Sequence, residues 1–411
     1  MNTTRDNLKG MIQRTLELYA YSKSPSEECP IFPDHIHIEP TNACNLRCVH
    51  CHQSSIGTHF TKSRGLMDFD LYTHLIDQLA ELSERITLDS HGEPLTHPRI
   101  VDMVAYARGK GLSVSLLTNA TLLTPDKAEG LIAAGLNRIV FSFEGSTPEL
   151  HEKVRRRSNY HRTMRNILGF LEMNCRADRP VFVCMSMVKS SYTEEDVETY
   201  KEYFYALPID TVFVNPLLTL SGGSPIGDER APESLAQQKV QNVCRMPWMN
   251  MAISWDGQIS PCIIDYNESH IVGDTTKESL LDIWNNSLYR KFRLSHLSGD
   301  FSWIEEQGPL CASCNIPYDP EYNEYDLLDM ASYATNYILR QATVHTAPEI
   351  APPLPPTETP QYARCQEEIT RFDRLLADGA GKRTPAGALG LTAANLRESA
   401  RSGRSSREAT P

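Results

Sequence analysis

The sequence lacks any apolar run approaching the roughly 20 residues that a membrane-spanning helix needs. Its first residues, MNTTRDNLKGMIQRTLELYAYSKS, lack the apolar centre of a signal peptide and follow the pattern of an amphipathic helix. A dense basic stripe is also missing, and the net charge of −12 argues against nucleic acid as a partner. We therefore expect a cytoplasmic protein with no membrane contact.

The composition gives no reason to expect disulfide bonds. A chain of 411 residues, 40% hydrophobic and 22% charged, can bury a full core without covalent cross-links. The eleven cysteines are therefore expected to be metal ligands or buried thiols.

Short apolar runs alternate with amphipathic helical stretches between residues 36 and 216. The predicted strands are 36–40, 85–90, 113–118, 138–143, 181–188 and 211–215. The predicted helices between them are 68–83, 98–110, 124–135, 147–173 and 193–206. This alternation predicts an α/β fold with a parallel sheet and right-handed crossovers. Eight repeats would close a TIM barrel, so six predict a partial one, with functional groups at the carboxyl ends of its strands.

Three cysteines, Cys44, Cys48 and Cys51, follow the first predicted strand in C-x3-C-x2-C spacing. Three thiolates can hold three irons of a [4Fe–4S] cube and leave the fourth iron open to a small molecule, whereas electron-transfer clusters normally take four cysteines. On these residues alone a zinc site is the alternative, with His50 or His52 completing four ligands.

The loop resembles the cluster loop of the radical S-adenosylmethionine (radical SAM) superfamily. The resemblance implies a partial (β/α)6 TIM-like barrel and a [4Fe–4S] cluster whose open iron binds S-adenosylmethionine. It also implies reductive cleavage of that molecule to a 5′-deoxyadenosyl radical. The residues that the resemblance places at S-adenosylmethionine lie at successive strand ends: His50 near the adenine, Gly92 and Glu93 at the ammonium, Asn119 at the ribose, Ser142, and Arg155 at the carboxylate.

A second set of four cysteines lies further along the chain: Cys244, Cys262, Cys311 and Cys314. With the turn Asp256-Gly257, which predicts a hairpin, they resemble the small SPASM/twitch domain that follows many radical SAM barrels. A full SPASM domain has further cysteines, and Pro320 stands where the next ligand would be expected. The resemblance therefore implies one auxiliary [4Fe–4S] cluster with four cysteine ligands, as in the 2-deoxy-scyllo-inosamine dehydrogenases of aminoglycoside biosynthesis. A structural zinc site is the alternative.

We expect five segments along the chain. They are a helical extension (1–30), the partial barrel (31–216), a linker (217–243), the auxiliary-cluster domain (244–345) with a helix at 323–342, and a Pro-rich, mostly disordered tail (346–411) with a short helix at 362–377.

Two groups of side chains are further candidates for catalysis. Cys184 should share a strand face with Phe182 and Ser186, and some radical SAM epimerases use such a thiol as a hydrogen donor. Several histidines crowd the strand ends and include a candidate base: His35, His37, His52, His59 and His91.

These features predict a radical SAM oxidoreductase or epimerase that acts on a polar small molecule such as a sugar or aminocyclitol. An electron donor such as flavodoxin or ferredoxin is the expected partner. Modification of a ribosomally made peptide is the first alternative. Only about 35 residues precede the first predicted strand, fewer than a leader-binding domain needs. A non-catalytic Fe–S or zinc protein is the second alternative.

Overall fold

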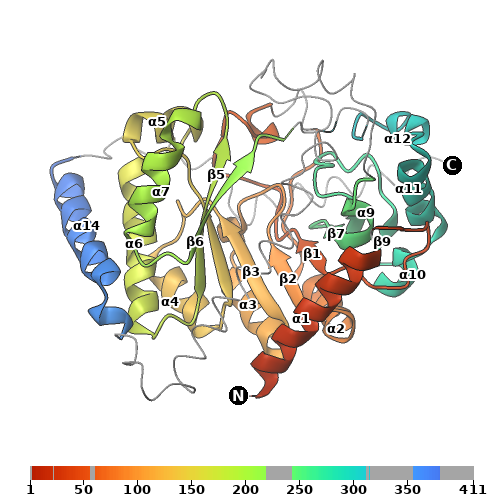
Figure 1. Cartoon of the computed structure of the whole chain (residues 1–411), viewed down its shortest axis with the longest axis horizontal. Coiled ribbons are helices and arrows are strands. Elements are labelled where there is room, and N and C mark those ends of the chain that lie inside the picture. The colour runs from red at the N-terminus through yellow and green to blue at the C-terminus, as the bar shows by residue number, and fades with distance from the viewer. Residues whose placement is uncertain are drawn as a thin grey trace.

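The computed structural model describes residues 2–21, 23–55, 61–218, 243–311, 314 and 355–379. Six parallel strands form the first part of the sheet: β1 (His35–Ile38), β2 (Arg85–Leu88), β3 (Ser113–Thr118), β4 (Arg138–Ser142), β5 (Phe182–Lys189) and β6 (Thr211–Pro216). Each strand pairs with the next along the chain, so the order never reverses (Figure 1). This confirms the predicted six-strand partial barrel.

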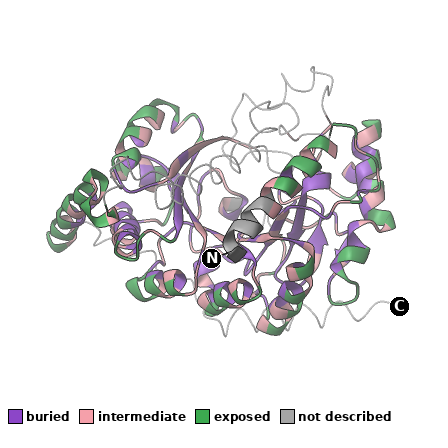
Figure 2. Cartoon of the chain, turned by 60° about the horizontal axis from the view of Figure 1, so that its bottom comes forward, coloured by how far each residue is buried: buried purple, intermediate pink, exposed green. Residues whose placement is uncertain are grey.

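Helices cover the outer face of this sheet: α2 (Phe69–Leu82), α3 (Ile100–Gly109), α4 (Pro125–Ala133), α5 (Pro148–Val154), α6 (Tyr160–Arg176) and α7 (Val197–Tyr205). Side-chain caps fix several of their starts, since Asp68, Thr124 and Asn159 each accept a hydrogen bond from a backbone N–H of the first turn. The buried residues lie along the strands and on the helix faces turned toward them, while the outer helix faces are exposed (Figure 2).

The prediction of one helix over 147–173 is wrong, because the structure has two helices there. The first ends at Val154, and Arg157 adopts a left-handed backbone conformation with φ of 76° before α6 begins. At the break, the buried side chain of Arg155 turns inward to form an ion pair with Glu144. A straight helix would not make this contact.

The second part of the chain extends the same sheet. Strand β7 (Asn250–Ile253) pairs in parallel with β1, and the antiparallel strands β8 (Gln258–Ser260) and β9 (Gly273–Asp274) follow it. Asp256-Gly257 forms the predicted hairpin turn between β7 and β8, with Gly257 at φ of 85°. Around these strands lie short helices: α9 (Met246–Met249), α10 (Leu280–Trp284), α11 (Ser287–Ser298) and α12 (Ser302–Glu305).

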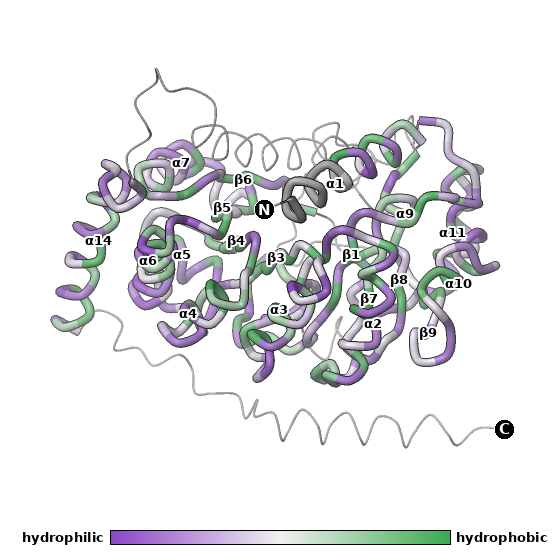
Figure 3. The backbone as a smooth tube through the Cα atoms, turned by 90° about the horizontal axis from the view of Figure 1, so that it is seen from below, coloured by the Kyte–Doolittle hydropathy of each residue, from purple (hydrophilic) through white to green (hydrophobic). Residues whose placement is uncertain are grey.

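Two further helices come from the ends of the chain. α1 (Asn2–Tyr21) has the predicted helical conformation. The 3-10 turn η5 (Pro356–Glu358) leads into α14 (Pro360–Ala377), which packs on the outside of α6 (Figure 3). The predicted helix at 323–342, most of the linker and the remainder of the tail lie outside the described residues. Within the described part, no helix combines the length and apolarity of a membrane span.

Alternate residues of each strand face opposite sides of the sheet. On β5, Val183, Met185 and Met187 belong to the large core under the helices. Phe182 and Cys184 instead belong to a small cluster with Val140, on the inner face of the barrel. The inner face therefore has its own small apolar group, and the remaining inward positions are free to be polar.

Candidate functional site

The first three cysteines lie in a loop that leaves β1 and rests on the end of α5. Backbone hydrogen bonds hold it there: Arg47 N donates to Arg156 O at 3.0 Å, and Val49 N donates to Val154 O at 2.9 Å. The loop is therefore fixed by residues that follow β4, far away in the sequence.

The thiols of Cys44, Cys48 and Cys51 have little contact with solvent. Burial, with the nearby Glu93 carboxylate, raises the pKa of Cys44 to about 12. Burial also raises the pKa of Cys48 and of Cys51. Metal ligation needs thiolates, so this donor set fits a centre whose positive charge offsets the burial. Among the described residues, no three His, Cys, Asp or Glu side chains are grouped closely enough to hold a single metal ion.

Gly92 and Glu93 join the end of β2 to the cysteine loop. A Cβ atom on Gly92 would lie 2.0 Å from the carbonyl oxygen of Thr41 and 2.8 Å from that of Ala43, so only glycine fits. The backbone N–H of Glu93 donates to Ala43 O at 2.9 Å. The Gly-Glu turn therefore sets the position of the segment that enters the cysteine loop.

The Glu93 carboxylate is buried and accepts hydrogen bonds from Leu95 N (3.0 Å), Thr118 Oγ1 (2.6 Å) and Asn119 N (2.8 Å). Asn119 in turn directs its Nδ2 toward Cys44 Sγ at 3.9 Å and Asn45 Oδ1 at 3.1 Å. The structure thus brings three of the predicted residues, Glu93, Asn119 and Cys44, into one network across β2, β3 and the loop.

Arg155 and Glu144 form a second buried network at the loop. Arg155 donates to the Glu144 carboxylate through Nε and Nη2, and its Nη1 lies 3.8 Å from Cys48 Sγ. Burial opposes both charges, but their mutual attraction raises the Arg155 pKa and lowers the Glu144 pKa. Sequence reasoning missed Glu144; a carboxylate directly after a strand, followed by Gly145, was the available signal.

Three other predicted residues lie around the barrel interior. His50 lines the cavity described below. Ser142 ends β4 beside Ser186 of β5. Cys184 belongs to the inner-face cluster with Phe182, but it is buried and is not among the cavity-lining residues; Arg138 Nε donates to its sulfur at 3.3 Å.

The second set of cysteines also comes together. Cys244, Cys262, Cys311 and Cys314 belong to one apolar cluster with Phe292, Ile304 and Leu310. Burial and the charges of the neighbouring cysteines raise the pKa of Cys262 and of Cys311. His296, which sequence reasoning missed, places Nε2 3.5 Å from Cys311 Sγ. Four thiols in one apolar cluster match the ligand count of a fully ligated iron-sulfur cluster.

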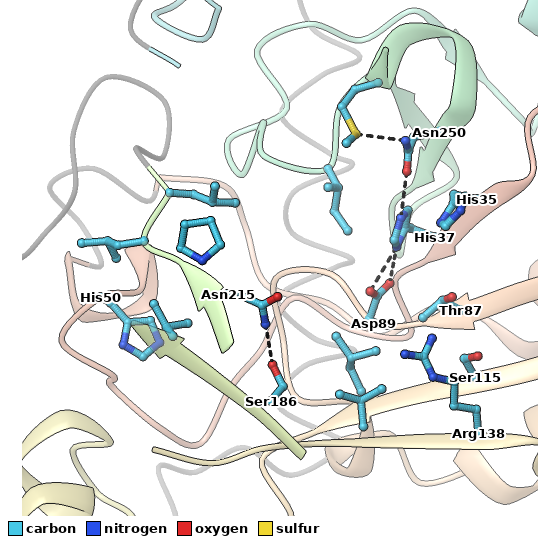
Figure 4. A pocket seen from close by; sticks show the side chains of 18 of the residues that line it. His35, His37, His50, Thr87, Asp89, Ser115, Arg138, Ser186, Asn215 and Asn250 are labelled. Atoms are coloured by element: carbon cyan, nitrogen blue, oxygen red, sulfur yellow. Dashed lines mark hydrogen bonds and ion pairs between the residues drawn. The ribbon is translucent and has the colours of Figure 1, made fainter. Parts of the chain in front are cut away.

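A cavity of about 360 Å³ occupies the barrel interior, and strands β1 to β7 all contribute to its wall (Figure 4). Its polar lining residues are His35, His37, His50, Arg85, Thr87, Asp89, Ser115, Arg138, Ser186, Asn215 and Asn250. Its apolar lining residues are Leu117, Val140, Val188, Pro216, Leu217, Leu218, Met246 and Ile263. A concave, mixed surface of this size suits a small organic ligand.

Sequence comparison identifies the family. Residues 38–204 match the Radical SAM superfamily, and residues 244–315 match SPASM, an iron-sulfur cluster-binding domain. The chain belongs to the radical SAM superfamily and carries a SPASM domain. Its cofactors are accordingly [4Fe–4S] clusters and S-adenosylmethionine.

Curated relatives differ in how much of their length the chain matches. An AdoMet-dependent heme synthase from Methanosarcina barkeri is 36% identical over 164 residues, covering 40% of this chain and 45% of the relative. The Pyrococcus furiosus tungsten-containing aldehyde ferredoxin oxidoreductase cofactor-modifying protein is 25% identical over 336 residues, covering 69% of this chain and 87% of the relative. The chain thus spans less than half of the first relative and most of the second.

The chain is similar to several solved structures. Streptococcus suis SuiB bound to its precursor peptide SuiA has a TM-score of 0.53 at 17% identity, covering 68% of this chain and 71% of SuiB. BtrN in complex with AdoMet and 2-DOIA has a TM-score of 0.47 at 20% identity, covering 69% of this chain and 93% of BtrN. The predicted fold class is confirmed, while likeness at this level leaves the substrate open.

Proposed function

We propose that this protein takes a hydrogen atom from a C–H bond of a polar small molecule held in the barrel cavity. The position of the cavity carries the proposal. His50 lies within the first cysteine loop, and Met246 and Ile263 are close in sequence to Cys244 and Cys262, yet all three line one cavity. A molecule bound there would contact neighbours of both cysteine sets.

In this proposal Cys44, Cys48 and Cys51 hold a [4Fe–4S] cluster with one open iron. When bound, the cluster and S-adenosylmethionine supply a 5′-deoxyadenosyl radical able to abstract hydrogen. Asn119 and Arg155 direct N–H groups at Cys44 and Cys48, and such donors orient ligand atoms and tune a metal centre.

The remaining predicted residues are assigned to S-adenosylmethionine. Gly92 brings the backbone close to the loop, and the buried Glu93 carboxylate provides the negative charge expected near an ammonium group. His50 offers a flat ring for the adenine, and Ser142 offers a hydroxyl at the end of β4. Arg155 is the residue assigned to the carboxylate, and its Nη1 is the guanidinium nitrogen that points toward the loop.

Cys244, Cys262, Cys311 and Cys314 hold one auxiliary [4Fe–4S] cluster in this proposal. Four cysteines complete its coordination, so the substrate does not bind to it directly. The place of all four cysteines in one apolar cluster supports a common centre. A zinc ion bound by the same thiolates is the alternative, and iron analysis separates the two.

A small molecule is favoured over a peptide because the cavity volume of about 360 Å³ suits a compact ligand. The peptide alternative has its own support, since SuiB shares the fold and was solved with its precursor peptide. Oxidation and epimerisation can both follow such a hydrogen abstraction, and Cys184 is the predicted hydrogen donor for epimerisation. A flavodoxin or ferredoxin as electron donor and a cytoplasmic location stay predictions from the sequence.

The test starts with protein reconstituted anaerobically. Two cubes correspond to about eight irons per chain, and dithionite with S-adenosylmethionine should then yield 5′-deoxyadenosine. Cys48→Ala should abolish this cleavage, and Cys311→Ala should preserve it but lose substrate turnover. Cys175→Ala, at a buried thiol outside both sets, is the matched control. Wild-type protein with full iron content that gives no 5′-deoxyadenosine would refute the proposal and favour a non-catalytic Fe–S protein.

A further inference from the structure

One layer of the barrel interior is polar on four neighbouring strands. The strand register pairs His37 of β1 with Thr87 of β2. It likewise pairs Thr87 with Ser115 of β3, and Ser115 with Arg138 of β4. All four line the cavity (Figure 4). We call these four residues the polar layer. Since inward positions of a barrel are commonly filled by apolar packing, a continuous polar layer facing a cavity calls for a ligand or a functional reason.

Both ring nitrogens of His37, in the polar layer, face oxygen atoms. Its Nδ1 lies 2.9 and 3.0 Å from the two carboxylate oxygens of Asp89, and its Nε2 lies 3.2 Å from Asn250 Oδ1. The Asn250 amide is oriented by its Nδ2, which donates to Met246 Sδ at 3.0 Å. Two oxygen acceptors facing both nitrogens stabilise the imidazolium form, because only that form donates twice. In that form His37 would offset the charge of Asp89.

The lining of the cavity is positive overall. Arg85 and Arg138 are cationic, and Asp89 is the carboxylate in the described lining. Arg85 has its own partner just outside the cavity, since its guanidinium binds Asp34 at 2.5 and 3.2 Å. Burial and the charges of Arg85, His37 and Arg138 keep the pKa of His35 well below its usual range, so His35 stays neutral.

Arg138 supplies the guanidinium group of the polar layer. Its Nε donates to Cys184 Sγ at 3.3 Å, and its guanidinium carbon lies 5.6 Å from the centre of the Phe213 ring. Beside it, the Thr87 and Ser115 hydroxyls make no hydrogen bond within the described residues, although both line the cavity. One guanidinium and two available hydroxyls are a donor set for a carboxylate or similar oxyanion.

We propose that the substrate carries a carboxylate that binds the polar layer at Arg138, Thr87 and Ser115. This inference rests on the proposed function, because it takes the cavity as the substrate site. Ser115 and Arg138 lie in the amino-terminal halves of β3 and β4, whereas His50 and the apolar residues Pro216, Leu217 and Leu218 lie toward the carboxyl ends of the strands. A carboxylate anchored at the polar layer thus directs the opposite end of the molecule toward the cysteine loop. An acidic metabolite and the terminal carboxylate of a peptide share this chemistry.

The test measures binding and needs no turnover. The probe is 4-bromobenzoate, and 4-bromobenzamide is its neutral match; both are titrated calorimetrically into reconstituted protein. We expect the benzoate to bind at least about tenfold more tightly than the benzamide, as a charge-assisted contact implies. Arg138→Gln should weaken only the benzoate, by a similar factor. In crystals soaked with the benzoate, the bromine anomalous peak should lie in the cavity, above the polar layer.

Equal binding of the two probes, or no benzoate binding, would overturn the proposal. So would an Arg138→Gln variant that keeps wild-type benzoate affinity. If Arg138→Gln fails to fold, the double variant Thr87→Ala/Ser115→Ala gives the same comparison without removing a charge. Arg165→Gln, at a partly exposed arginine paired with Asp373, is the matched control and should bind like wild type.

Two further arms separate the sources of the carboxylate and the two proposals. A tripeptide with a free C-terminus is compared with its C-terminal amide; a preference for the free acid that matches or exceeds that of the small probe indicates a peptide source. Cleavage of S-adenosylmethionine is measured on the same preparation. Selective binding of the carboxylate without cleavage of S-adenosylmethionine would refute the proposed function but support the anion site. Cleavage of S-adenosylmethionine without selective binding would support the proposed function but refute the anion site.

Discussion

The imidazole ring of His52 lies parallel to the phenol ring of Tyr266, with centroids 4.7 Å apart and an interplanar angle of 2°. His52 follows Cys51, and Tyr266 comes four residues after Cys262. The stack therefore connects the loop of the first cysteine set to the segment that carries a cysteine of the second. It is a direct contact between the two proposed cluster sites.

Removing the ring of Tyr266 should loosen this connection. Tyr266 is largely buried, and truncating a buried aromatic ring typically costs about 3–5 kcal/mol. We expect Tyr266→Ala to lower the free energy of unfolding by about 2–4 kcal/mol in anaerobic urea titrations. Tyr266→Phe keeps the stack and should cost less than about 1 kcal/mol. An alanine variant as stable as wild type would mean that the stack does not hold the two segments together.

Gly92→Ala should disrupt the cysteine loop. The new Cβ would lie 2.0 Å from the Thr41 carbonyl oxygen, so the backbone that enters the loop must shift. We expect the variant to retain much less iron than wild type after reconstitution, measured by iron analysis and absorbance. Gly109→Ala is the control, because a Cβ there meets nothing within 4 Å. Equal iron contents of Gly92→Ala and wild type would contradict this reading of the turn.

Glu144→Gln should leave the buried Arg155 without its counter-charge. Breaking one partner of a buried ion pair costs roughly 3–5 kcal/mol, whereas exposed pairs contribute about 1 kcal/mol or less. Denaturant unfolding should show the larger loss for Glu144→Gln and almost none for Asp102→Asn, whose pair with Arg99 is about half exposed. Similar stabilities of the two variants would show that the Glu144–Arg155 pair is not the anchor described here.

Stability should fall with acidification partly through His151. Burial and the charge of Arg155 lower the pKa of His151 to about 4. In the unfolded chain this histidine binds a proton below about pH 6.5, whereas the native state keeps it neutral. Between about pH 6.5 and 4 the unfolded state therefore gains protons and the native state loses stability, by up to roughly 3 kcal/mol. Above that window the effect is absent.

Urea titrations of the His151→Gln variant check this effect. The difference in unfolding free energy between pH 7 and pH 5 should be smaller for His151→Gln than for wild type. His74→Gln, at an exposed position, should keep the wild-type pH dependence. An unchanged pH dependence in His151→Gln would show that His151 does not titrate as described.

Local patterns were sufficient to predict much of the barrel. The six parallel strands lie within a few residues of their expected bounds, because each is a short apolar run between amphipathic helices. Glu93 and Asn119 lie beside the cysteine loop, because the carboxyl ends of parallel strands meet at one edge of the sheet.

Other features depend on contacts between distant parts of the chain. The pairing of β7 with β1 joins residues more than 200 positions apart, which no local pattern specifies. The break before α6 follows from the pairing of Arg155 with Glu144, because helix propensity alone would continue through Arg155. The polar layer arises from the register of four strands, so His37 and Arg138 could be placed in one cavity only from the structure.

The most direct test of the central claim uses S-adenosylmethionine labelled with 15N at the amine and 17O at the carboxylate. Electron-nuclear double resonance of the reduced cluster is recorded in the Cys311→Ala variant, which leaves Cys44, Cys48 and Cys51 in place. The account predicts hyperfine coupling from both labels, as expected when the molecule chelates the open iron. A cluster that shows no coupling, with four protein ligands before and after the addition, would contradict it.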